Sequence, residues 1–153
     1  MHEMPKPTAA HRKLEQLLGS WSGEEKMSPS PWDPKGGTAI GRVENRSAVD
    51  GFVVVQDYVQ ELDGTASFRG HGVFSVEGEE ILLHWWDSMG LPPNVFRGQF
   101  EGNTLTLSFA GAQGHHRTVF SLTEPNQYEF RMDVSQDGQE WYTFMEGTYA
   151  RTE

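Results

Sequence analysis

The chain has 153 residues, a formal net charge of -10 and no cysteine. Its length is typical of one domain with one core, which we predict to span residues 1–153. The lack of cysteine excludes disulfides, thiolate metal sites and thiol catalysis. Its acidic balance, without a run of Lys or Arg, argues against binding to a phosphate backbone, so no nucleic-acid partner is expected.

Two observations bear on the location of the protein. No apolar run approaches the roughly 20 residues that a membrane-spanning helix needs, so no membrane partner is expected. The first residues, MHEMPKPTAAHRK, lack the apolar stretch of a secretory signal. We therefore expect a cytoplasmic protein, in agreement with the absence of cysteine.

A single short helix is predicted at the start of the chain, over about residues 8–18. Thr8 is a suitable N-cap, Leu14, Leu17 and Leu18 share one side, and Gly19 ends the helical pattern.

From residue 19 to residue 151 the sequence alternates between apolar and polar residues and is divided by turn signals. The signals that set the register are Asp50-Gly51, Asp63-Gly64, Glu77-Gly78, Gly102-Asn103 and Asp137-Gly138. This pattern predicts about ten antiparallel strands joined by hairpins. A sheet that long avoids open edges by closing, so the expected fold is an all-β, up-and-down barrel with a short N-terminal helix.

Two-residue turns fix the register, and the register decides which side chains share a face. If the first three signals are two-residue turns, one continuous face lies inside the barrel, and a one-residue bulge would invert the assignment. The later hairpins add Phe130 and Met132 to this interior. The predicted interior face comprises Arg42, Glu44, Arg46, Val53, Val55, Asp57, Val59, Phe68, Gly70, Gly72, Phe74, Ile81, Leu83, Trp85 and Asp87.

The charged residues of this face have two interpretations. Buried charges are costly unless paired, so they form either an ionic network in a filled barrel or part of a ligand site. Gly70 and Gly72 likewise either make room for the Trp85 indole or leave a hollow for a ligand. Apolar walls with a few polar groups are typical of ligand pockets.

The opposite face of the same hairpin carries His71, His84 and Trp86. The assumed register pairs the two histidines directly, so they are candidate metal ligands, although no third ligand is visible. The alternative is an ordinary cross-strand pair on a half-exposed surface. An exposed Trp86 would be an anchor for a homodimer, because Trp is enriched in interface hot spots.

Catalysis finds little support in the motifs. The chain has no G-x-S-x-G motif and no glycine-rich phosphate loop before a helix. Glu44 and Asp57 could form an acid/base pair, but Arg42 and Arg46 beside them would hold both carboxylates ionised. We therefore favour a protein that is not an enzyme, with no catalytic residue assigned.

The runs LEQLLGSWSGE, GTAIGRVENR, FVVVQDY, FRGHGVFSV and WWDSMG together resemble a bacterial family known as domain of unknown function 1579. The resemblance extends from about Leu14 to Tyr149. It implies a small calycin-type barrel, related in shape to lipocalins and fatty-acid-binding proteins, and it implies no reaction.

The start LLGSWSGE is also similar to that of nitrobindin-like haem barrels, which hold iron through a histidine on the last strand. Aligning the ending FMEGTYAR places Phe144 or Met145 at that position. A phenylalanine cannot ligate iron, and a lone methionine is a poor sole ligand for ferric haem. No cofactor is therefore predicted, and a haem or metal barrel remains an alternative only.

The function that these observations favour is binding of a small, partly apolar, anionic ligand, such as a fatty or aromatic acid, in the barrel. Phe68, Phe74, Trp85, Phe130 and Met132 would form the walls. Arg42 and Arg46 would pair with the anion, with Asp57 and Asp87 orienting the arginines. The alternative is an assembly protein with a filled barrel and a homodimer surface around Trp86.

Overall fold

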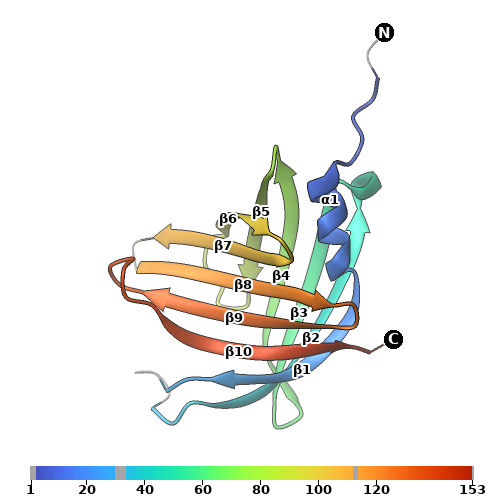
Figure 1. The fold of residues 1–153 in the computed structure, drawn as a ribbon. Coiled ribbons are helices and arrows are strands. Elements are labelled where there is room, and N and C mark those ends of the chain that lie inside the picture. The colour runs from blue at the N-terminus through green and yellow to red at the C-terminus, as the bar shows by residue number, and fades with distance from the viewer. Residues whose placement is uncertain (1–2, 30–33, 112–113, 153) are drawn as a thin grey trace.

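The structure, a computed structural model, describes residues 3–29, 34–111 and 114–152. These residues form a closed barrel of ten antiparallel strands in the order β1-β10-β9-β8-β7-β6-β5-β4-β3-β2 (Figure 1). The prediction of an all-β, up-and-down barrel with one short N-terminal helix is therefore confirmed. Residues 1, 2 and 153 of the predicted domain lie outside the described part of the chain.

Each strand is hydrogen-bonded to its sequence neighbours, and β1 pairs with β10 to close the barrel. The ten strands are β1 Gly19–Met27, β2 Gly37–Ala48, β3 Val53–Leu62, β4 Thr65–Glu77, β5 Glu80–Asp87, β6 Asn94–Glu101, β7 Thr104–Gly111, β8 Gly114–Glu124, β9 Gln127–Ser135 and β10 Tyr142–Arg151. The helical elements are α1 Ala9–Leu14 and the two 3-10 turns Glu15–Leu17 and Val49–Gly51.

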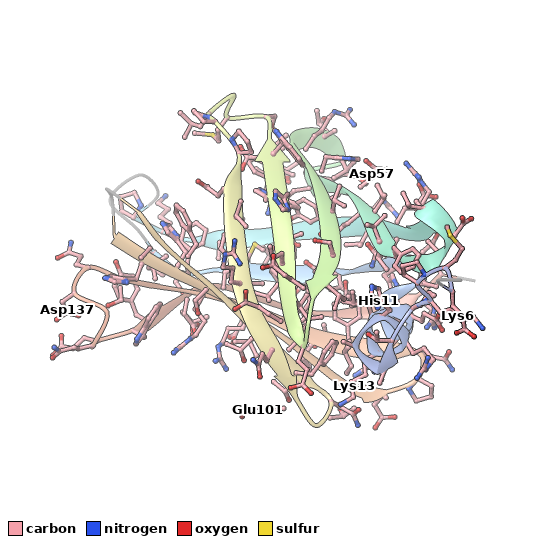
Figure 2. All side chains as sticks on the ribbon, turned by 90° about the horizontal axis from the view of Figure 1, so that it is seen from above. Lys6, His11, Lys13, Asp57, Glu101 and Asp137 are labelled. Atoms are coloured by element: carbon pink, nitrogen blue, oxygen red, sulfur yellow. The ribbon has the colours of Figure 1, made fainter. Side chains whose placement is uncertain are left out.

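The N-terminal helix closes one end of the barrel. Leu14 and Leu17 are fully buried in the core, as the apolar side of the predicted helix requires. The carbonyl of Leu17 accepts hydrogen bonds from Trp21 Nε1 at 2.9 Å and Asn45 Nδ2 at 2.7 Å, which tie the helix end to β1 and β2. In Figure 2 Lys13 marks this end and Asp137 marks the loop at the other. The helix thus covers one end of the barrel interior.

Of the first three predicted hairpins, one has the predicted register, one is displaced by two residues with the same faces, and one has its faces reversed. Between β2 and β3, Arg46 lies opposite Val55 and Glu44 opposite Asp57, as expected. Between β4 and β5 the turn is displaced, so Gly72 faces Trp85 instead of Leu83, but the same side chains still share a face. Between β3 and β4 the register shifts next to Gln60, which reverses the face of β3 relative to β4.

An extra residue on β4 causes this reversal. Glu61 lies opposite Ala66 and Gln60 opposite Phe68, which leaves Ser67 without a partner across the ladder. The Ser67 hydroxyl donates a hydrogen bond of 3.2 Å to the Gln60 carbonyl. A bulge of this kind turns the following side chains to the opposite face.

As a result, seven residues predicted inside the barrel lie on its outer face: Arg42, Glu44, Arg46, Val53, Val55, Asp57 and Val59. Arg42, Glu44, Arg46 and Asp57 are exposed, and in Figure 2 Asp57 lies on the outer side of the ribbon. Arg42 pairs with Glu61 on the outer surface. The side chains that point inward from β2 and β3 are instead Val43, Asn45, Val54, Gln56, Tyr58 and Gln60.

No helix in the described part of the chain has the length and apolar character needed to span a bilayer.

Candidate ligand-binding cavity

A cavity of about 260 Å³ lies in the barrel interior. Its wall is mostly apolar, with aromatic rings from seven strands and three methionines. Residues of the helix do not line it, in keeping with the plug at the far end of the barrel. The lining residues are Met27, Val43, Gln56, Tyr58, Gln60, Phe68, Leu83, Trp85, Asp87, Phe96, Thr118, Phe120, Tyr128, Phe130, Met132, Phe144, Met145 and Tyr149.

The Trp85 side chain lies flat across two glycines of β4. A Cβ atom at Gly70 would overlap Cζ2 and Cη2 of the indole, and one at Gly72 would lie 3.1 Å from Cε3. Trp85 Nε1 donates a hydrogen bond of 2.9 Å to Asp87, whose other oxygen accepts from the backbone N–H of Met89. Of the two interpretations of these glycines, the observed one is that they make room for the indole.

Five of the residues predicted to form the site line the cavity: Phe68, Trp85, Asp87, Phe130 and Met132. Phe74 is fully buried in the core beside the cavity, against Phe120 at a ring distance of 5.9 Å. The two arginines that were expected to bind an anion, Arg42 and Arg46, do not line the cavity, because they lie outside the barrel.

Two polar side chains in the cavity wall have no hydrogen-bond partner among the described residues. Gln56 is 7% exposed and Thr118 is 6% exposed, and both line the cavity. Among the described residues the one fully buried side-chain N or O atom without a partner is Asn45 Oδ1, so the polar atoms of Gln56 and Thr118 reach the open space of the cavity. These two groups therefore mark positions where a bound molecule or water would complete the wall.

A buried carboxyl group on β1 lies behind one side of the cavity. Glu25 is 0% exposed and accepts hydrogen bonds from the Tyr58 hydroxyl at 2.8 Å, from Gln60 Nε2 at 2.9 Å and from the Tyr149 hydroxyl. The three donors line the cavity, whereas Glu25 does not. None of the ion pairs of the described residues includes Glu25.

The sequence carries a signal for this network. In the segment GSWSGEEKM, Glu25 has the same parity as Trp21 and Met27, so the pattern places it on the face that carries the large apolar side chains. An acidic residue on such a face is the informative exception to alternation.

The phenols of this region are held in their protonated form. Burial raises the pKa of Tyr58 and of Tyr149 far above the ordinary value of 10.0, and the negative charge of Glu25 raises it further. Burial also raises the pKa of Tyr128, with a smaller contribution from Glu25. Tyr58 and Tyr149 are thus protonated at neutral pH and act as hydrogen-bond donors to Glu25.

On the outer surface, His71 and His84 do not face each other. The displaced turn between β4 and β5 places His71 opposite Trp86 and His84 opposite Val73, which corrects the predicted pairing. His71 Nδ1 lies 2.7 Å from Asp57 Oδ1, and both imidazoles lie near the Trp86 ring, with centroids 6.2 and 6.4 Å away. Within residues 3–29, 34–111 and 114–152, no group of three potential metal ligands was found.

Nitrobindin-like barrels carry their iron-binding histidine on the last strand, and the resemblance in sequence places Phe144 or Met145 at that position. Both line the cavity here, and its lining contains no histidine among the described residues. The donor set thus does not fit a haem iron.

A second charge cluster stabilises the outer face of β8, β9 and β10. Asp133 is 3% exposed and accepts hydrogen bonds from Arg117 Nη2 at 2.8 Å, Arg131 Nε at 3.0 Å and Thr143 Oγ1 at 3.0 Å. Burial alone raises the pKa of Asp133, but the hydrogen bonds from Arg117, Thr143 and Arg131 outweigh it, so the pKa lies below its ordinary value of 3.8. Arg117 also stacks over Trp141, 4.2 Å from the ring centroid.

Solved structures with the same barrel fold are known. The crystal structure of Rv2717c from M. tuberculosis superposes with a TM-score of 0.72 at 15% identity, covering 95% of this chain and 99% of that one. The S-type phycobiliprotein lyase CPES from Guillardia theta superposes with a TM-score of 0.64 at 10% identity, covering 96% and 99%. At these identities the similarity concerns the fold alone.

No curated protein gives a significant match in sequence. A family model, described as protein of unknown function (DUF1579), matches residues 6–151, which is nearly the whole chain. The family resemblance noted in the sequence is thereby confirmed. The chain belongs to the DUF1579 family.

Proposed function

We propose that this protein binds a small, largely apolar molecule in the barrel cavity, and that it acts as a binding protein, not an enzyme. The observation that carries the proposal is the cavity itself, with Gln56 and Thr118 buried in its wall and unpartnered among the described residues. In a filled barrel these two polar groups would be buried without a hydrogen bond, at a cost of about 1–3 kcal/mol each.

The size of the cavity sets the size of the ligand. An apolar cavity of about 150 Å³ is large enough to take up benzene. The 260 Å³ available here suits one or two rings, or a short branched chain, in contact with Trp85, Phe96 and Phe130. A long-chain fatty acid would have to extend beyond this volume.

The expectation of an anionic ligand depended on two arginines inside the barrel. Because Arg42 and Arg46 point outward, that reason no longer holds. Among the described lining residues there is no Lys, Arg or His, and the charged one is Asp87. We therefore propose a ligand whose polar group is not an anion.

Intrinsic tryptophan fluorescence and thermal melting test the proposal, because Trp85 lies in the cavity wall and a ligand that binds the folded state raises the melting temperature. The panel comprises indole, ethylbenzene, short aromatic acids, medium-chain fatty acids and isoprenoid acids. We expect saturable one-to-one binding of compact neutral members. Emission and melting temperature that do not change with any member would contradict the proposal.

A pair of matched variants locates the binding. Thr118→Leu adds volume to the cavity and removes its hydroxyl, so we expect binding to weaken about tenfold. Thr123→Leu makes the same change at an exposed position of the same strand and should leave binding unchanged. Equal effects of the two variants would place the ligand elsewhere.

A second candidate function is self-association through the outer face around Trp86. Trp86 is 42% exposed, and Met89 and Leu91, which follow it, are 69% and 64% exposed. Large exposed apolar side chains of this kind are typical anchors of interfaces. Sedimentation of the wild type and Trp86→Ala tests the candidate: a dimer that becomes a monomer supports it, and unchanged mass in both removes it.

A further inference from the structure

We propose that the cavity selects a compact apolar amine, whose N–H groups donate to Tyr58 and Tyr149 and whose positive charge is balanced by Glu25 and Asp87. This inference rests on the proposed binding function and adds the chemical class of the head group.

The fold is built around the Glu25 carboxyl. On the adjacent strands its neighbours are Ala39 of β2 and Gly147 of β10. A Cβ atom at Gly41 would overlap Glu25 Oε2 and would lie 2.7 Å from its Cδ. Small residues on both sides thus leave a slot that the carboxyl fills, so its position is set by the backbone.

The protons of the side chains around Glu25 are already used in hydrogen bonds. A phenol has one proton, and both Tyr58 and Tyr149 donate theirs to Glu25. Gln60 likewise directs its amide nitrogen to Glu25 at 2.9 Å and to the Tyr58 oxygen at 3.2 Å. Because these protons are committed, the two phenols, which line the cavity, can offer a ligand only the remaining lone pairs of their oxygens. This part of the wall therefore accepts hydrogen bonds.

A phenol that donates to a carboxylate is also a stronger acceptor, because hydrogen bonds in a chain polarise one another. A ligand N–H bound to Tyr58 or Tyr149 would continue such a chain to Glu25. Glu25 does not touch the cavity, so it acts as a positioning residue through the two phenols.

The charged side chain that lines the cavity is a carboxylate, that of Asp87. Tyr58, Gly70 and Asp87 lie opposite one another on three successive strands, and both Tyr58 and Asp87 line the cavity. Asp87 is held in place by Trp85 Nε1 and by the Met89 N–H. No cationic side chain is among the described lining residues.

Two carboxylates without a cation make the local potential negative. In a region of low dielectric constant, such a potential attracts an ammonium group and repels a carboxylate. The donors that remain in the wall, Gln56 and Thr118, are neutral and do not reverse this preference.

The closing experiment compares one skeleton with four head groups: phenethylamine, 2-phenylethanol, 3-phenylpropanoate and ethylbenzene, measured by isothermal titration calorimetry against the full chain. We expect phenethylamine to bind at least about tenfold more tightly than 3-phenylpropanoate, because hydrogen bonds to charged groups are the strong ones. The alcohol should lie between them.

Three variants then test the role of Glu25. Glu25→Gln keeps the size of the side chain and removes the charge, so the ratio of amine to carboxylate affinity should fall toward one. Tyr149→Phe keeps the ring and removes the acceptor, and it provides the same test if Glu25→Gln does not fold. Glu24→Gln, at the adjacent exposed position on the outer face, is the matched control and should leave the ratio unchanged.

The outcomes separate the two proposals. If ethylbenzene binds and the head group has no effect, the barrel is a binding protein and the amine inference is wrong. An amine preference that survives both Glu25→Gln and Tyr149→Phe would also overturn it. If none of the four compounds binds, both the inference and the binding of compact aromatic ligands are refuted.

Discussion

Replacement of Gly70 by alanine should destabilise the fold through one side chain, the Trp85 indole. A Cβ atom at this position would lie well under 3.0 Å from Cζ2 and Cη2 of the ring. To restore ordinary contact the indole must move by about 1 Å, since inserted atoms in a packed interior are accommodated by such shifts. That movement also lengthens the 2.9 Å hydrogen bond from Trp85 Nε1 to Asp87.

The magnitude follows from these two effects. Overpacking costs about 1–3 kcal/mol, and weakening the hydrogen bond adds about 1 kcal/mol. Alanine restricts the unfolded chain more than glycine, which offsets about 0.4–1 kcal/mol. The net loss in the free energy of unfolding is therefore about 2 kcal/mol, or about 4–8 °C in melting temperature for a chain of this length.

Urea denaturation followed by circular dichroism measures the loss, and two further variants identify its origin. Gly37→Ala is the matched control, because nothing lies within 4 Å of a Cβ atom there, and its effect should stay within about 0.5 kcal/mol. In a Trp85→Phe background, which removes the overlapping part of the indole, Gly70→Ala should cost much less. An equal loss in both backgrounds would refute the packing argument.

Two further predictions concern titration. The pKa of Asp133 is lowered in the folded state, so its contribution to stability is present above the ordinary value of 3.8 and is lost as the pH falls through the lower folded value. Asp133→Asn should therefore reduce the free energy of unfolding by about 2 kcal/mol at pH 7, and urea melts should show this difference shrinking in acid; a difference that is constant with pH would contradict the assignment. The pKa values of Tyr58, Tyr128 and Tyr149 are raised above 10.0, so their contribution is complete below pH 10 and falls as the pH rises further. Ultraviolet titration should find these three phenols ionising together with alkaline unfolding, and their ionisation in a chain that is still folded would show that they are not buried.

The sequence predicted the architecture well because turn residues report on local backbone geometry. Asp50-Gly51 marked a connection whose register came out correctly over the whole of β2 and β3. The turn after β4 was displaced by one position, which moved each pair by two residues and left the faces unchanged. Errors of an even number of residues do not alter which side chains point inward.

The interior could not be predicted in the same way, because a bulge has no clear turn signal. Ser67 is an ordinary strand residue, and the alternation of β3 gave no clear choice of face. One face of β3 carries Val53 and Val55, and the other carries Gln56, Tyr58 and Gln60. The polar face is the one inside, since Tyr58 and Gln60 hold the Glu25 carboxyl. Sequence patterning fails where function or a buried network breaks the rule of apolar interiors.

The slot for the Glu25 carboxyl has a consequence for how the sequence can vary. Oε2 of Glu25 occupies the space that a side chain at position 41 would need. A relative that keeps an acid at position 25 is therefore expected to keep glycine at position 41, whereas in one that loses the acid a Cβ atom there has only the Tyr149 ring, 2.9 Å away, to displace. The residues at positions 25 and 41 should therefore covary. In an aligned family, an acid at position 25 together with glycine at position 41 would identify the members that retain the buried charge.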